Sequence, residues 1–166
     1  QKVLRFIAPY LAFGVFLLVN AIANHDLTPF YVYGVIILVL IAADMASKGD
    51  AARMLLIFSI LGICALFVGM TTTGMISVYA FTSVGLFCST LWPCIFALSV
   101  RGLGKHTSQG SSFLIMMIMG GGIISWLQGS VSESIGIQSS YIVGVLCFTY
   151  LGFFAWIVKR RYSAEV

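Results

Sequence analysis

Two long apolar segments, residues 75–100 and 108–131, flank a short basic turn, and together they restrict the fold more than any other feature. A helix rises about 1.5 Å per residue, so about 20 apolar residues cross the roughly 30 Å hydrocarbon core of a bilayer. Both segments are long enough. The chain is 60% hydrophobic and only 8% charged, whereas a soluble domain has about 25% charged residues. The sequence therefore predicts an integral membrane protein.

The remaining apolar segments extend this prediction to an all-α, polytopic membrane protein with six transmembrane helices. We expect a single transmembrane domain over residues 1–166, with spans at approximately 3–22, 30–46, 52–70, 75–100, 108–131 and 140–158. The connections between them are short, which makes neighbouring helices antiparallel.

The basic residues predict the orientation of these spans. With six spans, all nine Lys and Arg residues fall on one side of the membrane, which the positive-inside rule identifies as the cytoplasm. Both ends of the chain are then cytoplasmic, and residues near Asp26 and Ile137 lie outside. Membrane topology and anionic lipid headgroups account for the net charge of +4, so no nucleic-acid partner is expected.

Small and polar residues form a stripe on each of the two central helices, if successive residues are placed about 100° apart. The stripes contain Thr82, Gly85, Ser89, Trp92 and Pro93 on the first helix, and Gly110, Met117, Gly121, Ser125, Gln128 and Ser132 on the second. Such stripes commonly pack helices together. Contact with a ligand is an equal alternative for Gln128 and Trp92, because an amide beside an indole also binds polyols. Ser89 and Ser125 are weaker candidates on the same stripes.

Two features predict bending or close packing of these helices. Pro93 lies inside a span, where it removes a backbone donor and favours a kink. Gly120, Gly121 and Gly122 have no side chains, so the second helix can bend there or a neighbouring helix can approach closely.

The other helices have little that a polar ligand could contact. The spans at 30–46, 52–70 and 140–158 are almost entirely apolar and are expected to be lipid-facing supports. By elimination, the spans at 75–100 and 108–131 line any cavity.

No pattern indicates an enzyme, a metal site or a cofactor. His25 and His106 lie in loops without a second ligand nearby, and the glycine-rich stretch lacks the Lys-Ser/Thr of a phosphate loop. The cysteines lie inside predicted spans without metal or redox spacing, where they behave as small apolar residues: Cys64, Cys88, Cys94 and Cys147.

A series of motifs carries a resemblance to a known family. In order, the motifs are Trp92-Pro93-Cys94-Ile95-Phe96-Ala97-Leu98, Gly102-Leu103-Gly104-Lys105, Gln109-Gly110-Ser111, Gly120-Gly121-Gly122-Ile123-Ile124 and Leu127-Gln128-Gly129. They resemble the last third of the fucose/galactose/glucose:proton symporter family of the major facilitator superfamily. The sequence departs from that pattern at Ser125-Trp126, where relatives commonly have proline. Over residues 1–50 the resemblance is weak.

The resemblance implies the C-terminal part of a sugar:proton symporter in a bacterial inner membrane. Such a carrier works by alternating access on a hexose or fucose-type monosaccharide, with the N-terminal helical bundle of the same transporter as its partner. It needs no cofactor beyond the coupling proton. No Asp or Glu lies in the middle of a predicted span here, and in that family the coupling carboxylates lie in the N-terminal half.

The chain begins with Gln1 and not with methionine, so we expect it to be a piece of a longer protein. We expect no signal peptide, because the first apolar stretch follows Lys2 and Arg5 without a small-residue cleavage site. The third to sixth helices match the last four of the family, so we expect the first two to be an inserted pair. Two alternatives stay open: a non-transporting six-helix subunit, and a half-transporter that acts as a homodimer. The coding sequence upstream of Gln1 distinguishes them.

Overall fold

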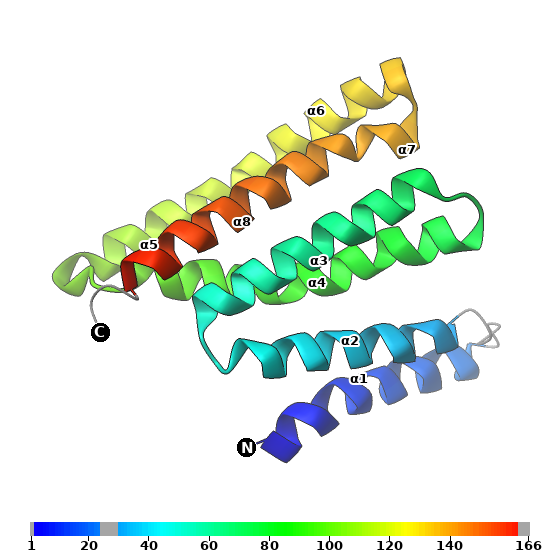
Figure 1. The fold of residues 1–166 in the computed structure, drawn as a ribbon, viewed down its shortest axis with the longest axis horizontal. Coiled ribbons are helices and arrows are strands. Elements are labelled where there is room, and N and C mark those ends of the chain that lie inside the picture. Colours follow the sequence, from blue (N-terminus) through cyan, green and yellow to red (C-terminus); the bar gives the residue numbers. More distant parts are fainter. Residues whose placement is uncertain (1, 24–29, 163–166) are drawn as a thin grey trace. The chain divides into compact units, whose positions relative to one another are not determined.

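The computed structural model describes residues 2–23 and 30–162, with side chains for 9–23 and 30–160. Every regular element in these ranges is helical, so the predicted all-α, polytopic membrane fold is confirmed (Figure 1). The expected loop around His25 and Asp26, and the tail with Glu165, lie outside the described residues. The elements are α1 Lys2–Ile22, α2 Tyr31–Ser47, α3 Ala51–Thr71, α4 Met75–Val100, η2 Gly104–His106, α5 Thr107–Met116, η3 Met117–Met119, α6 Gly120–Ile135, α7 Ile137–Ser140 and α8 Ile142–Tyr162.

Four helical segments of the described chain are long and apolar enough to cross a membrane. They are Ala51–Thr71, Met75–Val100, Gly104–Ile135 and Ile137–Arg160, and two shorter apolar helices precede them at Pro9–Ile22 and Tyr31–Ser47. The six segments coincide with the six expected spans. The expectation that all six cross the membrane stays a prediction.

The chain divides into two compact units, Gln1–Ala46 and Ser47–Val166. In the first unit, the Tyr10 hydroxyl donates a hydrogen bond to the Gly34 carbonyl over 3.4 Å, and the Phe16 and Phe30 rings meet edge to face at 5.2 Å. The boundary falls at the end of the second expected span, where the inserted pair was predicted to end. The single transmembrane domain and the inserted pair both stay predictions.

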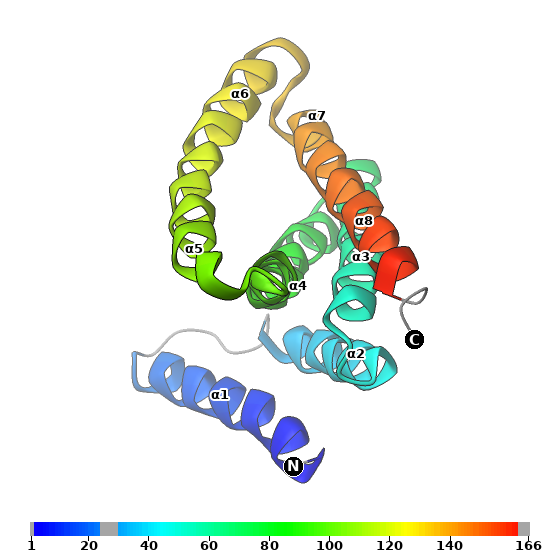
Figure 2. The same cartoon turned by 90° about the vertical axis from the view of Figure 1, so that its left-hand side faces the viewer.

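Helix α3 is the centre of the second unit, because α4 and α8 both pack against it (Figure 2). Its buried residues recur every three or four positions, as a helix face in contact with neighbours requires: Ala52, Leu55, Phe58, Ser59, Gly62, Leu66 and Gly69. Two glycines allow this closeness. A Cβ at Gly62 would collide with the Phe148 ring of α8, and one at Gly69 would lie 2.9 Å from the Phe81 ring of α4.

The expectation that span 52–70 is a lipid-facing support is therefore wrong. Its apolar composition suits helix packing as well as lipid contact, and the two glycines determine which occurs. Helix α8 is also more than a support, since Val143, Val145, Phe148 and Ala155 are buried.

The segment after α4 is one long, interrupted helix, formed by α5, η3 and α6 and called the α5–α6 rod below. The helix was expected to end at residue 131, but it continues to Ile135. A 3₁₀ turn at Met117–Met119 interrupts the α-helical pattern directly before the three glycines. Mid-helix 3₁₀ turns often mark hinges. None of residues 104–135 is buried within the described chain.

Candidate functional site

Helix α4 has one buried face and one exposed face. The buried face contains Ser77, Ser83, Phe87, Leu91, Cys94 and Leu98. It packs against α3, where the Phe58 and Phe87 ring centroids lie 6.2 Å apart. The predicted stripe of Thr82, Gly85, Ser89, Trp92 and Pro93 lies entirely on the exposed face. The stripe therefore lies outside the buried face that packs on α3.

The two α4 candidates differ in what they offer a ligand. The Ser89 hydroxyl donates a hydrogen bond to the Leu86 carbonyl over 2.6 Å, so its oxygen is left as an acceptor. The Trp92 side chain is 41% exposed and presents both a ring face and an N–H donor. Helix α4 continues through Pro93 without a break, and the predicted kink is not tested.

Helix α6 carries the other two candidates. Ser125 is exposed and Gln128 is partly exposed, one turn apart on the same face. Farther along this stripe, the Ser132 hydroxyl donates to the Gly129 carbonyl over 2.7 Å. Among the described residues, neither Gln128 nor Ser125 has a hydrogen-bond partner. Their polar groups are available to a ligand or to another helix.

The four candidates do not bond to one another. The structure places Ser89 and Trp92 on α4 and Ser125 and Gln128 on α6, and within residues 30–160 no hydrogen bond joins the two pairs. Their assignment to substrate binding stays a prediction.

The glycine triple is open to its surroundings. Apart from the rod's own nearby backbone, no described atom lies within 4 Å of a Cβ built at Gly120, Gly121 or Gly122. No helix of this unit packs closely against these residues. A hinge here would require bending at the adjacent 3₁₀ turn. A packing site would require a helix that does not belong to this unit.

A polar cluster around Gln138 was not predicted from the sequence. The Gln138 amide nitrogen on α7 lies 2.6 Å from the Thr72 carbonyl oxygen and 2.7 Å from that of Gly69. The Met70 carbonyl and the Ser77 hydroxyl are farther away, at 3.3 and 3.5 Å. Ser77 itself donates to the Gly69 carbonyl over 2.8 Å. One sequence signal was available: the end of α3 leaves backbone carbonyls that the helix cannot satisfy.

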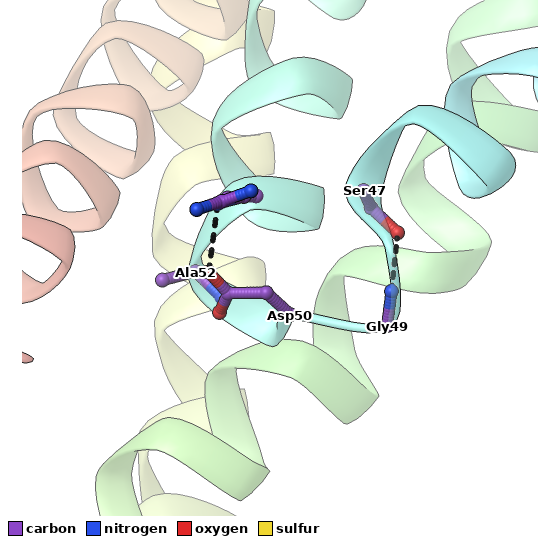
Figure 3. A network of polar contacts seen from close by, with 5 residues as sticks. Ser47, Gly49, Asp50 and Ala52 are labelled. Carbon is purple, nitrogen blue, oxygen red and sulfur yellow. Dashed lines mark hydrogen bonds and ion pairs between the residues drawn. The ribbon is translucent and has the colours of Figure 1, made fainter.

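A second polar network lies at the other end of α3 (Figure 3). An Asp50 carboxylate oxygen accepts a hydrogen bond from the Ala52 backbone N–H over 3.0 Å, and so caps the helix. The other oxygen pairs with Arg53 at 3.2 Å. The turn before it has positive φ at Lys48 and Gly49, and Gly49 donates its N–H to the Ser47 hydroxyl.

The described residues of the basic turn between α4 and α5 are not arranged as metal ligands. His106 Nδ1 lies 3.3 Å from the Gln109 side-chain oxygen, and both residues are exposed. Across the part of the chain that the structure describes, no three His, Cys, Asp or Glu side chains gather as metal ligands would. His25 lies outside the described residues.

Comparisons with known proteins identify relatives over about two thirds of the chain. A glucose/galactose transporter from Brucella abortus is 37% identical over 111 residues, which are 67% of this chain and 27% of that protein. An L-fucose-proton symporter from Escherichia coli is 32% identical over 112 residues, 67% of this chain and 26% of that protein. A putative glucose/galactose transporter from Helicobacter pylori is 39% identical over 87 residues, 49% of this chain and 21% of that protein.

The chain thus matches only about a quarter of the length of these curated relatives. No family model matches the chain, and no solved structure matches it. All three relatives are named as transporters and none as an enzyme. The resemblance to the fucose/galactose/glucose:proton symporter family that the motifs indicated is therefore confirmed over about two thirds of the chain.

Proposed function

We propose that this chain is the C-terminal part of a proton-coupled monosaccharide transporter that works by alternating access. The observation that carries the proposal is the 37% and 32% identity to a glucose/galactose transporter and an L-fucose-proton symporter, each over about two thirds of the chain. The substrate is a hexose or a fucose-type sugar, in keeping with the names of those relatives. The protein is a carrier and not an enzyme.

The exposed polar stripes on α4 and α6 support the proposal that a second helical bundle packs against them. Polar groups such as the Gln128 amide cost free energy in hydrocarbon unless they are hydrogen-bonded or reached by water. Within this unit Gln128 stays partly exposed and has no hydrogen-bond partner among the described residues, while the apolar face of α4 is already packed on α3. The N-terminal helical bundle of the same transporter would cover the stripes and leave a polar path between the two halves. The relatives have length for such a bundle, since most of each is unmatched.

The candidate residues suit a hydroxyl-rich ligand. The Gln128 amide both donates and accepts hydrogen bonds, and the free lone pairs of Ser89 accept one. The Trp92 ring offers an apolar face on which a pyranose can lie. Ser125, one turn from Gln128, adds a hydroxyl on the same stripe.

The rod has features that suit a carrier with two conformations. The 3₁₀ turn at Met117–Met119 and the following glycines provide a place where the rod can bend with little steric cost. Bending there would move Gln128 relative to the cytoplasmic half of the same helix. Alternating access requires relative movement of this kind around the binding site.

The proposed orientation puts both ends of the piece in the cytoplasm of a bacterial cell, with the spans in its inner membrane. In the second unit, the start of α3 and the ends of α4 and α8 lie together (Figure 1). Six basic residues belong to this end: Lys48, Arg53, Arg101, Lys105, Lys159 and Arg160. Such a one-sided arrangement is typical of a cytoplasmic face. The coupling carboxylates are expected in the N-terminal bundle.

Uptake into proteoliposomes tests the proposal. The complete polypeptide that contains this chain should accumulate labelled glucose, galactose or fucose when the buffer outside is more acidic, and an uncoupler should abolish accumulation. The 166-residue chain alone should not accumulate sugar, because it lacks the other bundle. Uptake by the chain alone as a dimer would favour the half-transporter. Absence of uptake by the complete polypeptide for all three sugars would favour the non-transporting subunit.

A further inference from the structure

The α5–α6 rod is held mainly through its two ends. None of its residues is buried within the described chain, so broad side-chain packing does not fix it. At the basic turn, the Leu103 side chain lies against Gly110, where an added Cβ would be 2.5 Å from Leu103 Cδ1. At the other end, α6 stops at Ile135 and the chain passes through Gly136, with φ of 87°, into α7 (Figure 2). The structure of α7 therefore determines where this end of α6 lies.

Helix α7 is a single turn whose Ser140 is buried and whose Gln138 side chain donates hydrogen bonds to α3. The Gln138 amide nitrogen has two hydrogens, and its two shortest contacts are to the Thr72 and Gly69 carbonyls, at 2.6 and 2.7 Å. These carbonyls lie at or just beyond the C-terminal end of α3, where no helical N–H follows to bond them. The bond to the Thr72 carbonyl therefore satisfies an acceptor that would otherwise need another donor, whereas the Gly69 carbonyl also accepts a hydrogen bond from the Ser77 hydroxyl.

A separate contact holds the start of α8. The Tyr141 ring stacks on the Phe81 ring of α4 with centroids 4.2 Å apart, and Phe148 packs over Gly62 farther along. These apolar contacts do not involve the Gln138 amide. Removing that amide should therefore free α7 and the end of α6 more than α8.

We propose that Gln138 is a positioning residue for the candidate site: by anchoring α7 to α3, it determines where α6, and with it Gln128, lies relative to α4. Gln128 is ten residues before Gln138 in sequence, and only Gly136 separates α6 from α7. The significance of Gln128 rests on the proposed function, whereas the anchor itself is a structural claim. The two are tested separately below.

Distances between spin labels test the anchor in the complete polypeptide, reconstituted in phospholipid nanodiscs without sugar. One label is placed on the exposed Cys64 of α3 and the other at Ser130→Cys on α6, with the other cysteines replaced by alanine. Gln138→Leu should broaden this α3–α6 distance distribution. A control pair, Cys64 with Leu146→Cys on the exposed side of α8, should keep its width. An unchanged α3–α6 distribution, or equal broadening of both, would overturn the proposal.

A second variant avoids dependence on the folding of Gln138→Leu. Gln138→Glu has nearly the same shape, but its carboxylate has no N–H to give the α3 carbonyls, so it should broaden the α3–α6 distribution as well. Ser139→Glu adds the same charge at an exposed neighbouring position and should leave it narrow. Equal widths for the two variants would contradict the anchor.

Sugar affinity then separates the anchor from the proposed function. If Gln138→Leu broadens the α3–α6 distance distribution and also weakens sugar binding as Gln128→Ala does, the Gln138 anchor and the role of Gln128 as a sugar contact are both supported. If the distribution broadens while Gln128→Ala leaves affinity unchanged, the anchor holds and the role of Gln128 as a sugar contact is wrong.

Discussion

The Phe148 ring on α8 lies directly over Gly62 on α3, in the space that any larger residue at position 62 would need. Both residues are buried, and Phe148 is only 6% exposed. The same relationship recurs one helical turn along each helix, with the roles exchanged. There the Leu66 side chain of α3 lies 3.3 Å from a Cβ built at Gly144 of α8. Small residues on each helix thus receive large side chains from the other, which brings α3 and α8 close together.

Gly62→Ala should destabilise the protein, because the added methyl group forces Phe148 or the α8 backbone to move. Overpacking of this kind costs about 1–3 kcal/mol. Gly85→Ala is the matched control, since no described atom apart from its chain neighbours and the nearby α4 backbone lies within 4 Å of its Cβ position. Thermal unfolding of a fluorescent-protein fusion in detergent measures both. Equal melting temperatures for the two variants would contradict the close packing of Phe148 over Gly62.

Asp50 should stabilise α3 mainly as a helix cap. Asp50→Ala removes the hydrogen bond to the Ala52 N–H and should cost about 0.5–2 kcal/mol. Asp50→Asn keeps a capping oxygen but loses the negative charge at the helix N-terminus and with it the ion pair to Arg53. The two side chains of that pair are 46% and 43% exposed. Exposed pairs contribute about 0–1 kcal/mol, so this loss should be smaller. Denaturant unfolding in mild detergent gives the free energy of unfolding of both variants. A larger decrease for Asp50→Asn than for Asp50→Ala would contradict the role of Asp50 as mainly a helix cap.

Gln128→Ala should lower the apparent sugar affinity of the complete carrier by about 1–3 kcal/mol, the usual cost of leaving buried polar groups unpaired. Trp92→Phe should weaken binding as well, because it removes the N–H donor and shrinks the ring face. Gln109→Ala, at the basic turn, is the matched control. Binding and surface level are measured together. Reduced expression with unchanged affinity would identify Gln128 and Trp92 as packing residues only.

The predicted topology can be read by cysteine labelling in intact cells, against a background without native cysteines. Ile137 is 76% exposed, so Ile137→Cys should react with an impermeant thiol reagent from outside. His106→Cys should react only after the cells are permeabilised, because the positive-inside rule predicts that the basic end of the bundle is cytoplasmic. A cysteine at Asp26 should behave like the one at Ile137. Labelling of Asp50→Cys from outside would reverse the topology.

The positions of the helices could be predicted from sequence because about 20 consecutive apolar residues have few alternatives to a membrane helix. The interruption of the α5–α6 rod was indicated in part by Gly120, Gly121 and Gly122, although the 3₁₀ turn itself falls just before them, at Met117–Met119. The extension to Ile135 was missed because Ser132, Glu133 and Ser134 look like a polar loop, yet Gly136 is what ends the helix.

The partners of each helix could not be predicted in this way. The apolar surface of α3 looks alike from all sides, and only contact with Phe148 and Phe81 reveals that Gly62 and Gly69 are packing positions. Gln138 was missed because its acceptors at Gly69 and Thr72 are 69 and 66 residues away. The face that carries Ser89 and Trp92 was found because helical periodicity alone determines which residues share a face.

Protection of cysteines by sugar tests most directly whether the stripes on α4 and α6 line the sugar path. Ser125→Cys and Ser89→Cys are introduced into the complete carrier without native cysteines, with Ile137→Cys, at the start of α7, as the control. An impermeant methanethiosulfonate should modify the Ser125 and Ser89 variants, and saturating glucose, galactose or fucose should slow that reaction without affecting the control. Failure of all three sugars to slow the reaction at both positions would contradict the account.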